Sequence, residues 1–159
     1  MTKKIYIIDG YNLIHKSIVL RKLFIENPQL ARENLISILS DFFSKRKDEC
    51  IVVFDGNLNL PSSLSTPKVR VIFSNPPNKA DDEIKKIITS VNLKDRLIFI
   101  VVSSDNEIIN CAKVCGSGRI SSEEFLKILN SDKAKNKAQD DEKPLVKLTQ
   151  EEIKRMFRE

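Results

Sequence analysis

Apolar residues along this chain gather in short continuous runs, each of which stops at a polar or acidic residue. Four such runs, rich in β-branched and aromatic residues, span 5–8, 50–54, 69–73 and 97–102. Runs of this length and composition are typical of strands buried on both faces, as in a parallel sheet. A Gly-Ser-Gly turn at 116–118 leads into a short expected fifth strand at 119–120.

Helical periodicity separates the predicted strands. The expected helices span 13–24, 28–43, 80–91, 106–114 and 122–130. Asn27 and Pro28 are a helix start, with Asn as N-cap and Pro at the first helical position, and 121–124 is a capping box. Because strands alternate with helices, we expect right-handed βαβ units. The predicted fold class is α/β, with a mainly parallel central sheet flanked by helices.

The pattern changes after residue 130. Residues 131–144 consist largely of Lys, Asp and Asn, which predicts a polar linker. Residues 145–159 hold a second capping box, followed by an apolar face of Ile153, Met156 and Phe157. A helix this short is not stable alone, so it must dock on the domain, on another copy or on a partner. We therefore predict a domain at 1–130, a linker at 131–144 and a C-terminal amphipathic helix at 145–159.

Composition argues against a membrane-spanning protein and against a disulfide-rich protein. No apolar run approaches the roughly 18 residues that span a membrane, and the first residues resemble no signal peptide, so we expect a cytoplasmic protein without a membrane partner. Three cysteines argue against a disulfide framework. Cys111 and Cys115 lie four residues apart on a predicted helix, and packed free thiols are favoured over a zinc site.

The net charge of +5 is modest, but its distribution is informative. The tail from residue 131 holds 8 basic and 7 acidic residues, which leaves 19 basic and 15 acidic residues before it. If several of those acids share one pocket, the remaining surface is more basic than the total. This favours a polyanionic partner such as nucleic acid, although charge alone fits a soluble basic protein equally well.

Acidic residues stand where the predicted strands end. Asp9 follows the first strand, Asp55 the second and Asp105 the fourth, while Asp81 and Asp82 open the helix after the third. The carboxyl ends of parallel strands share one edge of the sheet, where ligands bind. Because clustered carboxylates repel one another, they predict a bound cation. A site rich in oxygen and free of histidine suits Mg²⁺ or Mn²⁺, which activates water and orients a phosphodiester.

Each of these acids taken singly has an ordinary alternative. An Asp at a strand end is common turn chemistry, and Asp55 is the least secure because Asp-Gly is a frequent turn dipeptide. Asp81 also suits the positive end of a helix dipole. The joint pattern is stronger, because the topology sends all of them to the same edge.

Six short motifs resemble one family in the family's own order. They are Ile-Asp-Gly-Tyr-Asn-Leu-Ile (8–14), Val-Phe-Asp (53–55), Val-Ile-Phe-Ser (71–74), Ala-Asp-Asp-Glu-Ile (80–84), Val-Ser-Ser-Asp (102–105) and Gly-Arg-Ile-Ser (118–121). The resemblance is to the YacP-like branch of NYN domains, in the PIN-like nuclease superfamily, and spans about 5–129. It implies a metal-dependent endoribonuclease that, in bacterial members, acts on messenger RNA associated with the ribosome.

The same resemblance implies roles for particular residues. Asp9, Asp81 and Asp105 match the metal-binding acids of the family, and Asn12 matches its site amide. Asp55 matches an acid that is often assigned to the site. The predicted catalytic set is therefore Asp9, Asn12, Asp81 and Asp105, and the predicted ligands of Mg²⁺ or Mn²⁺ are Asp9, Asp55, Asp81 and Asp105.

Three further residues are predicted RNA contacts, each with a plain alternative. Arg119 can hold a phosphate as a bidentate donor or be a surface charge at a strand edge. Lys79 can steer RNA or balance the nearby acids. Tyr11 can stack on a base, although packing in the signature turn is the more favoured use. His15, the single histidine, is favoured as an ordinary surface or helix-start residue.

Three alternatives to a nuclease remain open at this point. A non-catalytic module with the same fold would bind RNA or the ribosome without turnover. A phosphatase or nucleotide-binding protein would need a glycine loop for phosphate after the first strand, and 9–12 is not one. An interaction protein would work through the C-terminal helix.

Overall fold

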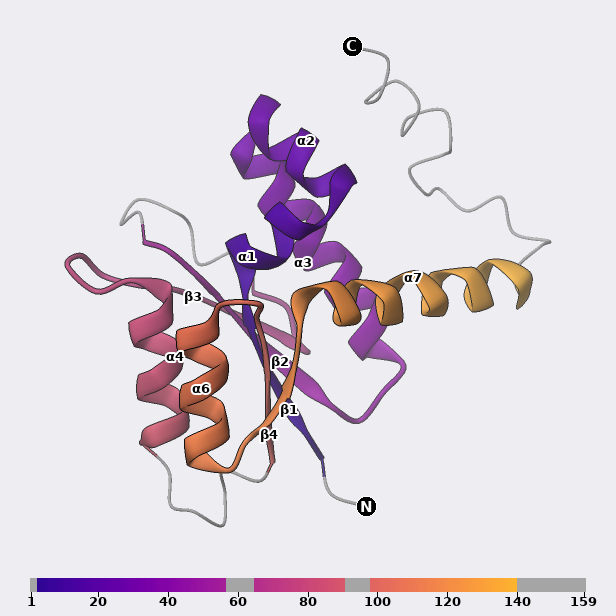
Figure 1. Cartoon of the computed structure of the whole chain (residues 1–159). Helices are drawn as coiled ribbons and strands as arrows, with labels where there is room; N and C mark the ends of the chain where they lie inside the picture. Colours follow the sequence, from indigo (N-terminus) through magenta and orange to yellow (C-terminus); the bar gives the residue numbers. More distant parts are fainter. Residues whose placement is uncertain (1–2, 57–64, 91–97, 140–159) are drawn as a thin grey trace.

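Five parallel strands form the centre of the fold, in the order β3-β2-β1-β4-β5 (Figure 1). The computed structural model describes residues 3–56, 65–90 and 98–139. The strands are β1 (Ile5–Asp9), β2 (Glu49–Phe54), β3 (Val69–Phe73), β4 (Phe99–Val102) and β5 (Gly118–Ile120). The predicted α/β class with a mainly parallel sheet is confirmed; residue 97, the expected start of the fourth strand, lies outside the described residues.

β1 is the central strand and pairs with both β2 and β4. From β1 the chain moves outward through β2 to β3, and then crosses back to β4 on the other side of β1. The direction of winding therefore reverses between β1 and β4. In open α/β sheets the carboxyl ends of the strands at such a reversal form the crevice in which ligands bind. The topology thus selects the ends of β1 and β4 as the place to look for a site.

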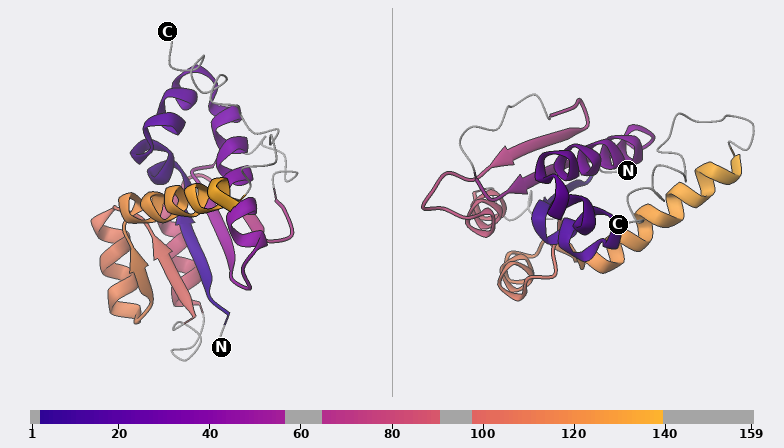
Figure 2. Two further views of the ribbon diagram at one scale, coloured as in Figure 1. Left: turned by 90° about the vertical axis from the view of Figure 1, so that its right-hand side faces the viewer. Right: turned by 90° about the horizontal axis from the view of Figure 1, so that it is seen from above.

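Helices cover both faces of the sheet. One layer holds α1 (Gly10–Lys16), α2 (Ile18–Glu26), α3 (Pro28–Ser44) and α7 (Ser122–Gln139), and the other holds α4 (Ala80–Thr89) and α6 (Asn106–Cys115). Figures 1 and 2 show α4 and α6 side by side on one face, with α3 and α7 on the other. Ile7 packs in the core under α4 and α6, and Ile8 packs in the core of the other layer, as the strand pleat requires.

The first helical segment differs from the prediction of one helix at 13–24. α1 begins directly after β1, and α2 begins after Ser17, whose side chain accepts a hydrogen bond from the N–H of Leu20 at 3.2 Å. Gly10 is the first residue of α1, so the chain passes from β1 directly into a helix at this glycine. A Cβ at that position would lie 2.3 Å from Cε1 of Phe54, so glycine is needed here for the close approach of β2 to the helix start.

The helix start at Asn27 and Pro28 is confirmed. The Asn27 side chain accepts a hydrogen bond from the N–H of Leu30 at 3.2 Å, and Pro28 is the first residue of α3. Most of the predicted apolar face of this helix is buried. Leu30 and Ile38 are exceptions, with 40% and 37% of their surface exposed.

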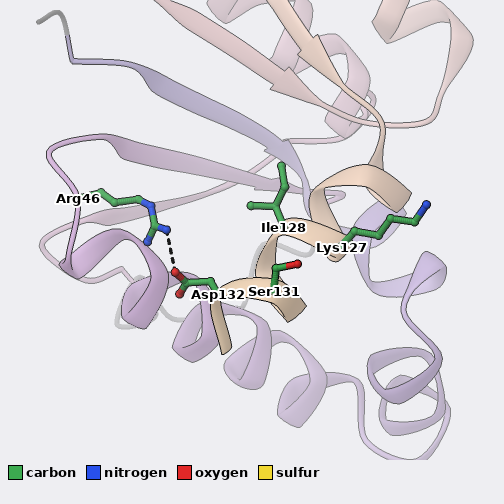
Figure 3. Close-up of a pocket in the computed structure, with 5 residues that line it drawn as sticks. All are labelled: Arg46, Lys127, Ile128, Ser131 and Asp132. Carbon is green, nitrogen blue, oxygen red and sulfur yellow. Dashed lines mark hydrogen bonds and ion pairs between the residues drawn. The ribbon is translucent and has the colours of Figure 1, made fainter. Parts of the chain in front are cut away.

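α7 continues to Gln139, so its predicted end near residue 130 is wrong and the first part of the predicted linker is helical. An ion pair of 2.8 Å between Arg46 and Asp132 holds α7 to the end of α3, beside a cavity of about 330 Å³ (Figure 3). The division of the chain at residue 131 stays a prediction. The predicted helix at 145–159 lies outside the described residues.

Two predictions made from composition concern membrane-spanning helices and the cysteines. No described helix has both the length and the apolar character needed to cross a membrane. Within the described residues none of the three cysteines forms a disulfide; Cys50 and Cys115 are buried and Cys111 is partly buried. The preference for packed thiols over a zinc site at Cys111 and Cys115 stays a prediction.

Candidate functional site

The predicted acids arrive at the carboxyl edge from separate elements. Asp9 is the last residue of β1, and Asp55 directly follows β2. Asp105, three residues after the end of β4, is the N-cap of α6, and Asp81 lies in the first turn of α4. Because β1 and β4 are neighbouring strands at the reversal of winding, Asp9 and Asp105 follow adjacent strand ends at the carboxyl edge.

Asp9 is the central carboxylate of this group. It accepts a hydrogen bond of 3.2 Å from the hydroxyl of Ser103 and another from the backbone N–H of Asn12. Burial raises the pKa of Asp9 from 3.8 to about 6, against the lowering effect of these two hydrogen bonds. The negative charges of Asp55 and Asp105 raise the pKa further. Asp55 and Asp105 are therefore close enough for their charges to act on Asp9.

Ser103 connects two of these carboxylates. Its fully buried hydroxyl donates to Oδ2 of Asp9 and accepts from the backbone N–H of Asp105 at 3.0 Å. Asp105 in turn accepts hydrogen bonds through Oδ1 from the N–H groups of Glu107 and Ile108, at 2.9 and 3.4 Å. The serine thereby fixes the N-cap of α6 relative to the end of β1.

Asn12 joins three elements through one oxygen atom. Its Oδ1 accepts hydrogen bonds from the N–H of Ser104 at 3.0 Å and from the hydroxyl of Ser122 at 2.7 Å. A backbone N–H can only donate, so the atom that faces Ser104 is the oxygen of the amide. The orientation of the side chain is thus fixed by the protein, and its NH₂ group remains as a donor for another partner.

Ser104 adds a glutamate that the sequence did not single out for the site. Its hydroxyl donates a short hydrogen bond to the carboxylate of Glu123 and accepts from the N–H of Ser122 at 3.1 Å. The hydrogen bond from Ser104 lowers the pKa of Glu123, which is exposed to solvent. The sequence marked Glu123 only as part of a capping box, so its link to the end of β4 was missed.

Asp55 has a structural contact of its own. Its Oδ1 accepts a hydrogen bond of 2.6 Å from the N–H of Ala80, the first residue of α4. This contact holds the start of α4 at the carboxyl edge and so places Asp81 there. The carboxylate of Asp82 accepts from the N–H of Lys79 at 2.9 Å and is thereby held at the start of the helix.

Asp81 is less closely tied to the group than the other acids. The hydrogen bond with Glu107 is the main cause that raises the pKa of Lys85, and the charge of Asp81, one turn earlier on α4, adds to it. Neither Asp81 nor Asp82 is among the charges that shift the pKa of Asp9. Asp55 and Asp105 therefore lie within electrostatic range of Asp9, whereas Asp81 lies at the same edge, next to Ala80.

The chemistry of the donors suits a divalent cation. The acids offer carboxylate oxygens, which are typical ligands of Mg²⁺ or Mn²⁺. The Asn12 amide, with its oxygen and nitrogen atoms, belongs to the surroundings of such a site. The two charges that act on Asp9, those of Asp55 and Asp105, are both negative. A bound cation would reduce their repulsion with Asp9. Among the described residues, no group of three or more His, Cys, Asp or Glu side chains is arranged so that it could hold a metal ion. The oxygen donors and the negative charge of these acids are nevertheless suited to a divalent cation.

The predicted RNA contacts lie in different surroundings. Tyr11 packs between the rings of Phe24 and Phe54, at centroid distances of 5.4 and 4.9 Å, so its ring is occupied within the protein. Lys79 is exposed and directly precedes α4 at the carboxyl edge, whereas Arg119 is exposed on the outer strand β5. His15 is exposed, with its ring edge-on to Phe24 at 5.2 Å.

Comparisons with known proteins find relatives that are all described as YacP or YacP-like. A family model described as the YacP-like NYN domain matches residues 6–158. A Bacillus subtilis (strain 168) protein described as uncharacterized protein YacP is 30% identical over 105 residues, which cover 65% of this chain and 62% of that protein. The match thus spans less than two thirds of the relative's length.

Two solved structures are similar to this chain. The crystal structure of Rae1 (YacP) from Bacillus subtilis has a TM-score of 0.73 and 27% identity, over 86% of this chain and 79% of the other. The W164L mutant of the same protein has a TM-score of 0.71 and 25% identity, over 96% of this chain and 92% of the other. The likeness therefore extends over most of the chain.

Proposed function

Because the chain belongs to the YacP-like NYN domain family, a branch of a superfamily that consists generally of nucleases, we propose that it is a divalent-metal-dependent endoribonuclease. Its substrate would be messenger RNA in a ribosome-associated context, as the resemblance of its motifs implies. The observation that supports this proposal best is the meeting of Asp9, Asp55 and Asp105 at the winding reversal of the sheet.

The proposed metal ligands are Asp9, Asp81 and Asp105, with Asp55 as a further ligand, either direct or through water. When bound, the cation would supply a water activated for attack and would neutralise the leaving oxygen of the phosphodiester. Asp55 has one carboxylate oxygen engaged by the N–H of Ala80, which leaves the other oxygen for such a role. An ionised carboxylate presents two oxygens, so both functions are compatible.

The chain's own residues would position the substrate and these ligands. Ser103 holds Asp9 and Asp105 in a fixed relation through its hydroxyl. The NH₂ group of Asn12, oriented by Ser104 and Ser122, would donate to a phosphate oxygen or to a water at the crevice. The neighbouring Lys79 would contact the RNA backbone, which fixes the strand without reading its sequence.

A cleavage assay with one substituted carboxylate tests this proposal. Purified wild type and Asp9→Asn are incubated with end-labelled RNA, free and ribosome-bound, in Mg²⁺, in Mn²⁺ and in EDTA. We expect cleavage only by the wild type with a divalent cation. The matched control is Asp41→Asn, which makes the same chemical change at an exposed position of α3 and should cleave as the wild type does.

Two outcomes would overturn parts of the proposal. Cleavage by Asp9→Asn at the wild-type rate in Mg²⁺ would remove Asp9 from the site. RNA binding without turnover in either cation would favour the non-catalytic module instead. Cleavage of free RNA that equals cleavage of ribosome-bound RNA would remove the ribosome-associated context.

A further inference from the structure

An arginine in the helical layer that holds α1 and α3 is buried with no acidic partner among the described residues. Arg32, on α3, is 8% exposed. Its Nη1 donates to the hydroxyl of Tyr11 at 3.0 Å, and its Nη2 donates to Oε1 of Gln29 at 2.9 Å. Its Nε is buried and has no hydrogen-bond partner in the described part of the chain. Among the described residues, the hydrogen-bond partners of the guanidinium group are thus neutral side chains.

This arrangement is costly for a group that serves packing alone. A buried charge normally has a counter-charge, and a buried donor without a partner loses its hydration with no compensation. Arg46, just beyond the other end of α3, shows the usual solution, since its guanidinium pairs with Asp132 at 2.8 Å and lies 3.7 Å over the ring of Phe42. The difference marks Arg32 as a group whose natural counter-charge is not a described side chain of this chain.

Arg32 is coupled directly to the candidate site through Tyr11. Tyr11 lies between Gly10 and Asn12 at the start of α1, two residues after Asp9. Its ring packs 4.9 Å from Phe54, the residue that precedes Asp55. The phenol therefore packs beside the end of β2, and its hydrogen bond links Arg32 to the start of α1, which directly follows Asp9.

We propose that Arg32 binds a phosphate of the RNA backbone next to the acid group, and that Tyr11 holds the side chain when RNA is absent. This inference rests on the proposed function, because it assigns a subsite for the same substrate. A guanidinium group matches a phosphate with two parallel charge-assisted hydrogen bonds, which are stronger than bonds to a phenol and an amide. Because Nε is buried, the side chain must turn outward to offer this pair of donors, and only two neutral partners oppose the turn.

The test measures RNA binding rather than cleavage. All variants are made in the full chain with Asp9→Asn, and binding of a single-stranded RNA with a 5′-hydroxyl end is followed by fluorescence anisotropy over a series of salt concentrations. Arg32→Met keeps the length and apolar volume of the side chain. We expect its Kd to rise about tenfold and the slope of log K against log[salt] to become shallower by about 0.7, the contribution of one phosphate on a single strand.

The matched control is Arg46→Met, which removes the same charge at the far end of the same helix and should leave the salt slope unchanged. An unchanged Kd and slope for Arg32→Met, in a variant that melts cooperatively, would overturn the proposal. Tyr11→Phe gives a second test if Arg32→Met does not fold. Removal of the competing hydroxyl should tighten RNA binding, and unchanged or weaker binding would contradict the holding role of Tyr11.

The same experiments separate this inference from the proposed function. RNA binding that depends on Arg32, by a protein that never cleaves RNA, would support the subsite and contradict the nuclease. Cleavage by a protein whose RNA binding is independent of Arg32 would do the reverse.

Discussion

Ser103 shows how single residues set the properties of the carboxyl edge. It lies fully buried between the end of β4 and the N-cap of α6, and its hydroxyl is both a donor to Asp9 and an acceptor from the N–H of Asp105. The hydrogen bond to Asp9 favours the ionised carboxylate and so lowers its pKa against the effect of burial. One hydroxyl therefore controls both the position and the charge of the central carboxylate.

We predict that Ser103→Ala weakens both the fold and the activity. The partly buried hydrogen bond from the N–H of Asp105 is lost, which costs about 1 kcal/mol of unfolding free energy. The pKa of Asp9 rises further, so the acid limb of the pH–rate profile should move to higher pH. Urea denaturation and the pH dependence of RNA cleavage measure the two effects. Ser37→Ala, at an exposed position of α3, should change neither.

Asp9 itself should destabilise the metal-free protein at neutral pH. Its pKa is about 6 in the folded chain and 3.8 as the ordinary value, so the folded state binds more protons between these values. The stability that the protonated group contributes is complete below pH 4 and is lost as the pH rises through 6, by roughly 1–3 kcal/mol. In EDTA, Asp9→Asn should therefore gain stability relative to the wild type over this range. Equal pH dependence of the two unfolding free energies would contradict the assignment.

At the scale of elements, helix starts are held at the carboxyl edge by side chains from other elements. Asp55 accepts from the first N–H of α4, and Asn12 accepts from Ser104 and Ser122, which lie at the end of β4 and the start of α7. The first N–H groups of a helix have no partner within it, so the acceptor that Asp55 supplies stabilises α4 and fixes its position. The site is thus built from the same contacts that dock the helices.

Substitutions of Asp55 should separate its structural contact from its chemical role. Asp55→Asn keeps an oxygen that can accept from the N–H of Ala80 but removes the charge, so we expect little loss of stability and a fall in cleavage. Asp55→Ala also removes the acceptor and should cost about 1 kcal/mol more. Thermal denaturation and cleavage rates of the two variants make the comparison. Equal stability of both variants would show that the contact does not hold α4.

Gly10 fixes the approach of α1 to β2. A Cβ at this position would lie 2.3 Å from the ring of Phe54, so Gly10→Ala should destabilise the fold by about 1–3 kcal/mol. Phe54→Leu in the same chain should restore part of that loss, because it removes the ring atoms that clash. Gly116→Ala is a useful contrast, since a new Cβ there meets nothing within 4 Å and the cost comes only from the left-handed φ of 78°. Absence of rescue in the double variant would show that the clash is not with Phe54.

For the whole molecule, topology decides where the acids meet. The order β3-β2-β1-β4-β5 puts β1 between the two halves of the winding, so Asp9 has neighbours from β2 on one side and from β4 on the other. Carboxylates from separate elements come together only in the folded chain. A cation that needs several of them binds the folded state alone and stabilises it by mass action.

We therefore predict that divalent cations raise the melting temperature of the wild type. At a cation concentration 100 times Kd the unfolding free energy should increase by about 2.7 kcal/mol. Asp9→Asn should lose most of this increase, whereas Asp41→Asn should keep it. Calorimetric scans in EDTA, Mg²⁺ and Mn²⁺ provide the measurement. Equal increases in all three proteins would mean that the cation binds away from Asp9.

The sequence predicted the strands, the helices and the sheet edge that carries the acids better than it predicted the side-chain contacts. Each buried strand is a short run of β-branched and aromatic residues, and this local signal suffices to place four of the five strands. The order of strands and helices then sends Asp9, Asp55 and Asp105 to one edge, because parallel strands share a direction. The roles of these acids as metal ligands stay predictions, as do those of Asn12 and Asp81.

Other features depend on packing that no local pattern encodes. No local pattern shows that Gly10 is the first residue of α1 or that the ring of Phe54 leaves no room for a Cβ there. α7 runs to Gln139 through residues whose polar composition predicted a linker. Arg32 sits among apolar helical positions, and nothing in its neighbourhood along the chain indicates that its charge is buried against Tyr11.

The sequence by itself thus determined the succession of strands and helices and the edge that collects the acids, because those follow from local composition and from the geometry of parallel sheets. Tertiary structure alone decided which side chains meet there. The hydrogen bond from Ser103 to Asp9 joins residues 94 positions apart, and that from Ser122 to Asn12 joins residues 110 positions apart. Such contacts depend on how whole layers pack against the sheet, and that packing is a property of the complete chain.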